Sequence, residues 1–395
     1  MRLPTVAEID FISNNRSADV KKLALRLSSM PAEDRAFVLA QIDGLQRIRN
    51  KIPSWYGIDG LVLPPALSLE QCSSERTARY KSALCAGQSF CDLTGGFGVD
   101  FAFMAPRFER ATYVEQRSDL CEVMQHNAQL LQLAHVSVVC ADALAFLGST
   151  EEHYDCIFLD PARRDANGSK VVLLEQCQPN LAELYASLLM RCRTLVAKLS
   201  PMLDISAALQ LMEQTAEVHV IAVDGECKEL LFVSHSGQTP AEPVLRCVNL
   251  HGESQHEFSF VRSQEQAAQC VMAERPLAYL YEPNAAILKA GAFRSVAQEF
   301  GLQKLHQNSH LYTANEAVDA FPGRRFRVLD CFGAGTAELK YHLADVRAAN
   351  IATRNFPESV AQLRRRFRLA DGGDVYLFAT TLSRGQRVIV RCAKV

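Results

Sequence analysis

The chain has 395 residues, enough for two or three domains, and its 48% hydrophobic and 22% charged residues are typical of a globular protein. It has no run of about 18 apolar residues and no basic start leading into an apolar segment, which predicts a soluble cytoplasmic protein with no membrane partner. The formal net charge of −2 hides a basic end, because residues 321–395 hold 14 Lys and Arg against 6 Asp and Glu.

The 13 cysteines are spaced too widely to predict a metal site. Cys85 and Cys91, six positions apart, are the closest pair, and no Cys-x-x-Cys occurs. Zinc and iron–sulfur sites use closer ligand spacings. We expect reduced, mostly buried thiols and no metal.

Helical patterning opens the chain. Residues 17–51 predict two amphipathic helices, the second opened by Pro31 at a first-turn position. Pro64 and Pro65 mark a loop before the next helix. We interpret residues 1–83 as an N-terminal helical cap.

From Ser89 onward, strand and helix patterns alternate. The β-rich runs are 89–93, 111–115, 136–140, 154–159 and 194–199, and helical periodicity fills 118–133, 176–192 and 204–216. This alternation predicts an α/β domain, a parallel sheet with helices on both faces, over residues 84–240. The tight turn Asp224-Gly225 between two further strands predicts a closing antiparallel hairpin. The plan resembles the Rossmann-like class I methyltransferases.

Beyond residue 240 the alternation stops. Residues 244–262 indicate a strand pair, 277–318 a strand–helix–strand, and 321–395 an α+β unit. We predict two small α+β domains, 241–320 and 321–395.

The loop after the first β strand carries the strongest chemical signal. It reads Asp-Leu-Thr-Gly-Gly-Phe-Gly over residues 92–98, where glycines let the backbone approach a ligand and the acid can accept from an ammonium group. A dinucleotide-binding loop would need a third glycine at position 101, which is Phe101. The loop favours S-adenosylmethionine as cofactor, and a simple strand–helix turn is the alternative. The predicted cofactor-binding residues here are Asp92, Thr94, Gly95, Gly96 and Gly98.

Two later strand ends extend this predicted site. Glu115 ends the second strand, where a carboxylate can take both ribose hydroxyls or be a solvated charge. Asp142 follows the third strand, where it can accept from the adenine amino group beside the small Ala143, or cap the next helix. These two readings of Asp142 are compatible.

The fourth strand ends in Asp160-Pro161-Ala162-Arg163-Arg164. Asp160 and Pro161 are predicted at the catalytic end, where the methyl acceptor meets the cofactor. Nucleic-acid aminomethyltransferases carry a second proline and an aromatic residue after such a pair, so base stacking is not predicted here. Arg163 and Arg164 are predicted to hold a phosphate or carboxylate of the substrate, or to be ordinary surface arginines.

Two further segments bear on the chemistry. The strand after Thr194 ends Lys-Leu-Ser-Pro, with serine where a carbon-methylating enzyme would place a cysteine nucleophile, so transfer to nitrogen or oxygen is favoured. Upstream, Ser73 and Ser74 are predicted to bond the cofactor's carboxylate, or to cap a helix from residue 75. The glycine-containing run 328–336 resembles a second cofactor loop, but we interpret it as a strand and turn because no ribose acid or Asp-Pro follows it.

Four features of the sequence occur together: the helical cap, the run Ser-Leu-Glu-Gln-Cys-Ser-Ser-Glu-Arg-Thr-Ala, the 92–98 loop and the segment Asp-Pro-Ala-Arg-Arg. In this combination the chain resembles a bacterial family of class I methyltransferases. The tail from Arg354-Asn-Phe-Pro through residues 371–381 is similar to that family's THUMP-like domain, preceded by a ferredoxin-like domain. The resemblance implies an RNA substrate, tRNA or rRNA, and its modification at a base nitrogen. It leaves the oligomeric state open.

The basic tail favours RNA independently, because basic surface attracts phosphates without reading sequence. Arg364, Arg365 and Arg366 fall on a predicted helix and would line a phosphate-tracking face, or a solvated one. Two alternative functions stay open: methylation of a protein or small molecule, and non-catalytic RNA binding by a chain that retains the fold.

Overall fold

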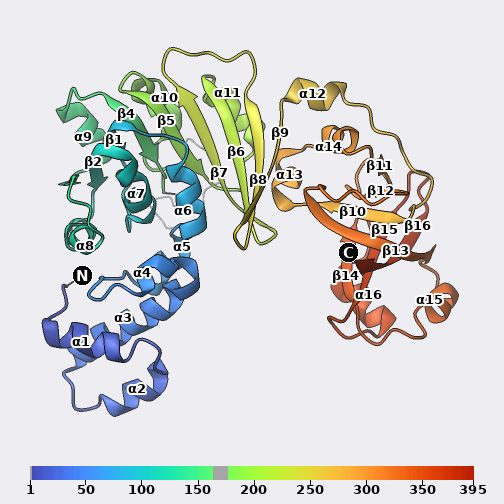
Figure 1. The fold of residues 1–395 in the computed structure, drawn as a ribbon, viewed down its shortest axis with the longest axis horizontal. Helices are drawn as coiled ribbons and strands as arrows, with labels where there is room; N and C mark the ends of the chain where they lie inside the picture. Colours follow the sequence, from blue (N-terminus) through green and yellow to red (C-terminus); the bar gives the residue numbers. More distant parts are fainter. Residues whose placement is uncertain (1, 163–176) are drawn as a thin grey trace. The chain divides into compact units, whose positions relative to one another are not determined.

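The computed structural model describes residues 2–162 and 177–395, which divide into two compact units. The first comprises Met1–Ala216 with Leu231–Pro240, and the second Glu217–Leu230 with Ala241–Val395. Figure 1 shows their elements. The helices are α1 (Val6–Asn14), α2 (Val20–Arg26), α3 (Ala32–Lys51), α4 (Pro53–Tyr56), α5 (Ala66–Gln71), α6 (Glu75–Ser82), α7 (Val99–Met104), the 3-10 turn η1 (Ala105–Arg107), α8 (Ser118–Leu130), α9 (Ala143–Ser149), α10 (Leu181–Leu189), α11 (Ile205–Leu211), α12 (Arg262–Ala267), α13 (Ala285–Ala290), α14 (Ser295–Glu299), α15 (Thr336–His342) and α16 (Val360–Phe367). The strands are β1 (Gly87–Asp92), β2 (Phe108–Glu115), β3 (Val136–Cys140), β4 (Tyr154–Leu159), β5 (Cys192–Leu199), β6 (Thr215–Val223), β7 (Glu226–His235), β8 (Val244–His251), β9 (Ser254–Phe260), β10 (Tyr279–Pro283), β11 (Gln303–Lys304), β12 (Tyr312–Ala314), β13 (Gly323–Gly333), β14 (Asn350–Arg354), β15 (Val375–Thr381) and β16 (Arg387–Lys394).

The N-terminal cap is helical, as predicted, but it begins earlier. The two helices predicted within 17–51 are α2 and α3, and the sequence analysis missed α1. The start of α1 is a capping box: the Thr5 hydroxyl accepts from the Glu8 backbone N–H, and the Glu8 carboxylate accepts from the Thr5 N–H.

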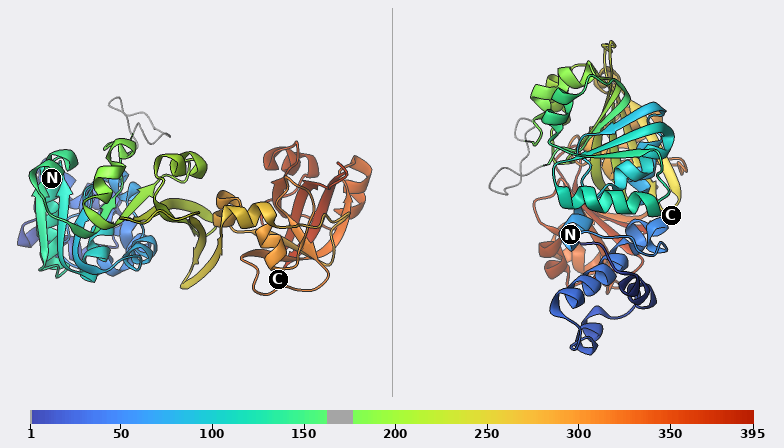
Figure 2. Two further views of the ribbon diagram at one scale, coloured as in Figure 1. Left: turned by 90° about the horizontal axis from the view of Figure 1, so that it is seen from above. Right: turned by 90° about the vertical axis from the view of Figure 1, so that its left-hand side faces the viewer.

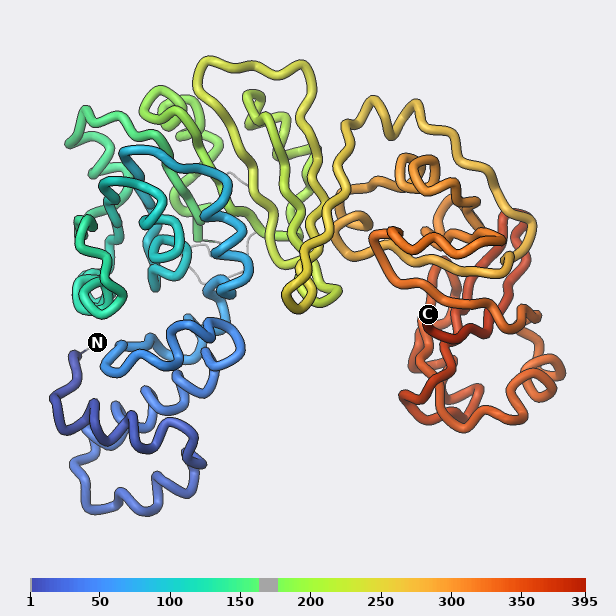
Figure 3. Tube along the Cα trace, viewed as in Figure 1, coloured from blue at the N-terminus to red at the C-terminus, as the bar shows by residue number. Residues whose placement is uncertain are grey.

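The cap shares one hydrophobic core with the sheet region of the first unit. The Trp55 ring lies edge-on to Phe97 at 5.6 Å and stacks on Phe103 at 6.3 Å. On α8, the Asn127 side-chain amide exchanges two hydrogen bonds of 2.9 Å with the backbone of Val62. The chain trace in Figure 3 follows these blue helices into the segment that leads to β1. The cap is therefore an integral part of the first unit.

The larger sheet has the strand order β3-β2-β1-β4-β5-β7-β6-β8-β9. Strands β1 to β5 pair in parallel with one another. In Figure 2, α6 and α7 (blue) lie across the sheet from α10 and α11 (light green). The turn between β6 and β7 has positive φ at both central residues, 50° at Asp224 and 86° at Gly225, as a two-residue hairpin requires. The first seven strands confirm the predicted class I methyltransferase plan.

The strand pair predicted at 244–262 is present but belongs to this larger sheet. β8 pairs in parallel with β6, and β9 pairs antiparallel with β8. The sequence analysis assigned these strands to the next α+β domain, because patterning does not reveal pairing partners. Here they cover the edge of β6, which would otherwise present unpaired backbone groups.

The second sheet has the order β11-β12-β10-β13-β16-β15-β14 and joins the two predicted small domains. β10 and β13 pair antiparallel, so Pro283 faces Gly323, where a Cβ would lie 2.1 Å from the Glu282 carbonyl oxygen. The run 328–336 forms the end of β13 and the start of α15, as predicted. Both strand partners of β13 are antiparallel, which a Rossmann-like cofactor loop does not use.

Candidate functional site

Four ionisable side chains lie at the carboxyl edge of the parallel strands. Asp92 ends β1 and Glu115 ends β2, while the register of β4 with β5 brings Asp160 level with Lys198. In open α/β sheets, ligands bind outside this edge where the strand order reverses, here between β1 and β4. The structure therefore brings the predicted site residues of three strands together.

The glycines of the 92–98 loop are required by the protein's own packing. A Cβ on Gly95 would lie 2.1 Å from the buried ring of Tyr113, and one on Gly98 would lie 2.7 Å from the Met124 sulfur. Gly96 and Gly98 also have positive φ, 55° and 84°. The shape of the loop is thus determined by β2 and α8, a reason that the sequence analysis, which considered only a ligand, did not supply.

Thr94 links the loop to the predicted acceptor end of the site. Its backbone N–H donates to Asp92 Oδ1 over 2.9 Å, and its hydroxyl oxygen accepts from the backbone N–H of Asp160 over 2.7 Å. Two strand ends are held together by one side chain. The predicted cofactor loop and the predicted catalytic residue are consequently in fixed register.

Asp92 is a buried carboxyl with few partners. It is 1% exposed, and within the described residues its side chain accepts hydrogen bonds from Thr94 alone. Burial raises the pKa of Asp92 to about 8, with smaller contributions from the nearby carboxylates Asp100 and Asp160. An ammonium group placed beside Asp92 would favour the ionised form of this carboxyl.

Glu115 ties the cofactor loop to the end of β2. Its Oε2 accepts from the backbone N–H of Gly96 over 2.9 Å, and its Oε1 accepts from that of Arg117 over 3.0 Å. Each carboxylate oxygen retains a second lone pair. Contact with ribose hydroxyls therefore stays a prediction that this geometry allows.

Asp142 caps α9. Its Oδ1 accepts from the backbone N–H groups of Leu144 and Ala145 at 2.9 and 3.2 Å, which confirms the capping interpretation. Ala143 beside it is buried. The adenine contact of Asp142 and Ala143 stays a prediction.

The two upstream serines have different roles in the structure. Ser74 is the N-cap of α6, and its hydroxyl accepts from the Thr77 N–H over 3.3 Å. Ser73 is 7% exposed, and its hydroxyl donates to Asp100 Oδ2 over 2.7 Å while accepting from Lys81 Nζ over 2.9 Å. The contact of these serines with a cofactor carboxylate stays a prediction.

Three charged residues of the site are not predicted by any sequence motif: Lys81, Asp100 and Lys198. Lys81 Nζ lies 2.9 Å from Asp100 Oδ1, and Lys198 Nζ lies 2.5 Å from Asp160 Oδ2 and 3.5 Å from Asp100 Oδ2. Lys198 could have been found from its place at the end of the strand expected beside the Asp160 strand. Lys81 and Asp100 carry no such signal, because only the packing of α6 on α7 brings them together.

Part of the predicted acceptor segment is outside the described residues. Asp160 is described, Pro161 is buried, and Ala162 exchanges two backbone hydrogen bonds with Gln178. The predicted substrate-binding pair Arg163 and Arg164 lies outside the described residues.

Comparison with known proteins identifies the relatives of this chain. A family model of a ferredoxin-like domain matches residues 279–322, and one of a THUMP-like domain matches residues 323–394, which confirms both predicted domain types. A crystal structure of a candidate methyltransferase from Porphyromonas gingivalis W83 is 36% identical, covers 100% of both chains and superposes with a TM-score of 0.88. This chain belongs to the family of that protein.

Other solved structures match only part of this family member. An rRNA methylase from Streptococcus thermophilus is 11% identical over 41% of this chain and 95% of its own, with a TM-score of 0.32. A SAM-dependent methyltransferase from Agrobacterium tumefaciens is 18% identical over 41% and 60%, with a TM-score of 0.32. Among curated proteins, none matches the chain.

The strand-edge site of this family member fits S-adenosylmethionine. The buried Asp92 carboxyl suits the cofactor's ammonium group, and among the described residues a Cβ on Gly96 would meet only the Thr94 carbonyl within 4 Å. Glu115 and Asp142 follow at the ends of the next two strands, in the order that a ribose and an adenine would need.

The arginines of the THUMP-like domain are partly neutralised by carboxylates. On α16, Arg364 pairs with Asp371 at 2.6 Å, and Arg366 pairs with Glu358 at 2.7 Å. Arg365 is exposed and has no ion pair within the described residues. Contact of the three arginines with RNA phosphates remains a prediction. Of the three, Arg365 is the one whose charge no described carboxylate neutralises.

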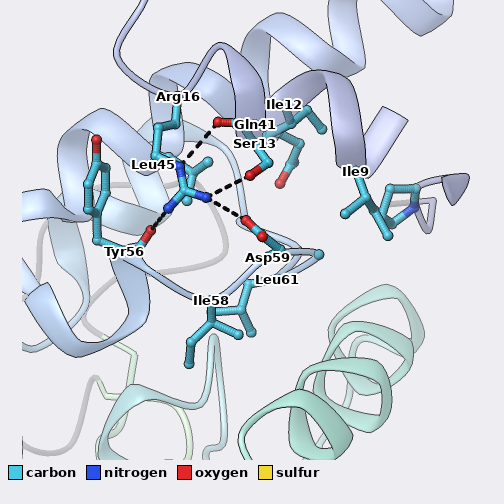
Figure 4. Close-up of a pocket in the computed structure, with 12 residues that line it drawn as sticks. Ile9, Ile12, Ser13, Arg16, Gln41, Leu45, Tyr56, Ile58, Asp59 and Leu61 are labelled. Atoms are coloured by element: carbon cyan, nitrogen blue, oxygen red, sulfur yellow. Dashed lines mark hydrogen bonds and ion pairs between the residues drawn. The ribbon is translucent and has the colours of Figure 1, made fainter. Parts of the chain in front are cut away.

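A pocket opens in the N-terminal cap, lined by residues between Pro4 and Leu61 (Figure 4). Arg16 crosses it and donates to the Tyr56 carbonyl, to the Ser13 hydroxyl and to Asp59. None of the predicted cofactor or substrate residues lines it. Because the polar groups of Arg16 are already satisfied, we assign the pocket to packing of the cap.

The described residues were also compared with the requirements of a metal site and of a membrane-spanning helix. Between residues 2–162 and 177–395, no three His, Cys, Asp or Glu side chains are grouped so as to hold a metal ion. No described helix combines the length and apolar character needed to cross a bilayer.

Proposed function

We propose that this chain transfers the methyl group of S-adenosylmethionine to a nitrogen of an RNA base, in tRNA or rRNA. The observation that carries the proposal is the convergence of Asp92, Glu115 and Asp160 at one edge of a sheet with the class I methyltransferase strand order. The THUMP-like domain at 323–394 and the 14 basic residues from 321 to 395 support RNA as the substrate.

The cofactor, when bound, supplies an electrophilic methyl group on a sulfonium, so the protein needs mainly to position the acceptor. Asp92 accepts from the ammonium group, Glu115 from ribose hydroxyls, and Asp142 from the adenine amine beside Ala143. Ser73 and Ser74 belong to the segment that closes over the methionine end.

Asp160 receives the acceptor. Its carboxylate accepts a hydrogen bond from the acceptor N–H and thereby turns the nitrogen lone pair toward the methyl group. The buried Pro161 restricts the backbone that carries this carboxylate. After transfer, the carboxylate can take the acceptor's proton. Arg163 and Arg164 are proposed to hold an adjacent phosphate.

The test uses labelled S-adenosylmethionine and total bacterial RNA from cells that lack this protein. We expect label in RNA, in one modified nucleoside after digestion, and none with Asp160→Asn. Label only in protein or in small molecules would instead support methylation of a protein or small molecule. Calorimetry distinguishes the proposed enzyme from a non-catalytic RNA-binding protein that retains the fold. Such a protein would bind no S-adenosylmethionine, or its affinity for S-adenosylmethionine would be unchanged by Asp92→Ala.

A further inference from the structure

Lys198 is a nearly buried cation, and its shorter ion pair within residues 2–162 and 177–395 is with the predicted acceptor carboxylate. Its side chain is 11% exposed, and its Nζ lies 2.5 Å from Asp160 Oδ2 but 3.5 Å from Asp100 Oδ2. Of the two described carboxylates that Lys198 contacts, Asp160 is the nearer. The Asp160 side chain is 35% exposed, so it is the member of this group that reaches the strand edge.

Asp100 already has a full counter-charge without Lys198. Lys81, which is fully buried, lies 2.9 Å from Asp100 Oδ1, and the Ser73 hydroxyl donates to Asp100 Oδ2. Burial on its own would raise the pKa of Asp100, but Lys81 and then Lys198 lower it, so Asp100 stays ionised. Ser73, Lys81 and Asp100 thus form one buried cluster, and Lys198 is a second cation that lies between Asp100 and Asp160.

The backbone and the side chain of Asp160 are held separately. Thr94 accepts from the Asp160 backbone N–H at 2.7 Å, which fixes the main chain to the cofactor loop. Lys198 fixes the carboxylate, and Asp100 contacts the same ammonium group. One carboxylate oxygen is thus committed to Lys198, which defines where the other lies.

We infer that Lys198 is a positioning residue for methyl transfer: it orients the Asp160 carboxylate toward the acceptor N–H, and Asp100, paired with Lys81, keeps Lys198 in place. This inference rests on the proposed function for its chemical meaning, but the geometry can be tested without activity. Misplacement of a positioning group by about 1 Å can cost on the order of 100-fold in rate.

The direct test compares crystal structures of the full-length wild type, Lys198→Met and Lys198→Arg. Methionine keeps the length of the side chain and removes its charge, while arginine keeps the charge. We expect the Asp160 carboxylate to leave its wild-type position, or to adopt several conformers, in Lys198→Met and to stay within hydrogen-bond distance of residue 198 in Lys198→Arg. An Asp160 carboxylate unmoved in Lys198→Met would overturn the inference. Lys198→Gln serves the same comparison if the methionine variant does not fold.

The kinetic test measures single-turnover transfer to RNA together with calorimetric affinity for S-adenosylmethionine. We expect Lys198→Met to lower the transfer rate at saturating substrates by about 10- to 100-fold, with cofactor Kd and RNA KM changed by less than about threefold, and Lys198→Arg to recover most of the rate. Lys228→Met, which removes an exposed lysine 2.5 Å from Glu226, is the matched control and should retain the full rate. An equal loss in Kd and in rate would assign Lys198 to cofactor binding and contradict the inference.

Failure of the proposed function would look different. If the wild type transfers no label to RNA, the substrate proposal fails, and the crystallographic comparison alone decides the role of Lys198 in placing Asp160. If the wild type is active and the carboxylate does not move in Lys198→Met, only the inference fails.

Discussion

The hydroxyl of Tyr113 donates a hydrogen bond of 2.5 Å to the carbonyl oxygen of Gly96. The Tyr113 ring is fully buried on β2, directly beneath Gly95. Burial raises the pKa of Tyr113, so its hydroxyl stays protonated and donates throughout the working pH range. A side chain outside the 92–98 motif therefore holds the cofactor loop in shape, and substitutions beneath the loop should act like substitutions within it.

Gly95→Ala tests this packing. The added Cβ would lie 2.1 Å from the immobile Tyr113 ring, so the loop or the ring must shift. We expect a loss of at least about 2 kcal/mol in stability of the first unit and weaker binding of S-adenosylmethionine. Thermal denaturation and calorimetry measure the two effects. Gly148→Ala in α9, where a Cβ would meet no described atom within 4 Å, is the control and should leave the melting temperature unchanged or raised.

Cofactor affinity should increase with pH through Asp92. In the free protein, burial raises the pKa of Asp92 to about 8, so this carboxyl holds a proton at pH 6 to 7. An ammonium group beside it favours the carboxylate, and binding then releases that proton. We expect affinity to rise by up to about tenfold between pH 6 and pH 7, measured by calorimetry in buffers of different ionisation enthalpy. Asp92→Asn should bind weakly with no such slope; an unchanged slope would exclude Asp92 as its source.

The same pKa predicts a pH-dependent stability cost. Between about pH 4 and pH 8, the folded protein holds a proton on Asp92 that the unfolded chain has lost, so the contribution of Asp92 to stability decreases as pH rises through this window. Asp92→Asn removes the titration. Its melting temperature relative to wild type should therefore be higher at pH 8.5 than at pH 5. A constant difference across this range would contradict the raised pKa.

Glu282 should contribute substantially to the stability of the second unit. Its side chain is 3% exposed and is clamped between Arg324 and Arg354, with an Arg354 contact of 2.6 Å. We expect Glu282→Gln to cost about 1–3 kcal/mol, because hydrogen bonds to a charged, buried acceptor are lost. The exposed pair of Glu274 and Arg384 provides the control, since Glu274→Gln should change stability by less than about 0.5 kcal/mol. Equal effects in thermal denaturation would show that burial does not matter here.

RNA binding should depend more on Arg365 than on its neighbours. Arg364 and Arg366 are paired with carboxylates, whereas Arg365 is exposed without an ion pair in the described part of the chain. We expect Arg365→Ala to reduce the slope of log K against log salt by about 0.7–0.9, the value of one phosphate contact, in filter binding to the RNA substrate. Arg384→Ala, which removes an exposed arginine paired with Glu274, should leave the slope unchanged. Equal slopes for both variants would remove Arg365 from the RNA interface.

Local signals predicted the class of the fold and most of the strand-end residues. The alternation from Ser89, the two-residue turn at Asp224-Gly225 and the acids at the ends of β1, β2 and β4 follow from periodicity and from the convergence of parallel strands at one edge. The capping roles of Ser74 and Asp142 were also readable, because caps depend on residues within one turn.

Contacts between segments that are distant in the sequence could not be predicted from local patterns. The sequence by itself determined where strands and helices form and which acids end the strands, because these depend on neighbouring residues. Only the tertiary structure decided that β8 and β9 extend the larger sheet. It also decided that Lys81, Asp100 and Lys198 form the ion pairs next to Asp160. These contacts join segments 19 to 98 positions apart in the sequence, so they depend on packing and not on any local pattern.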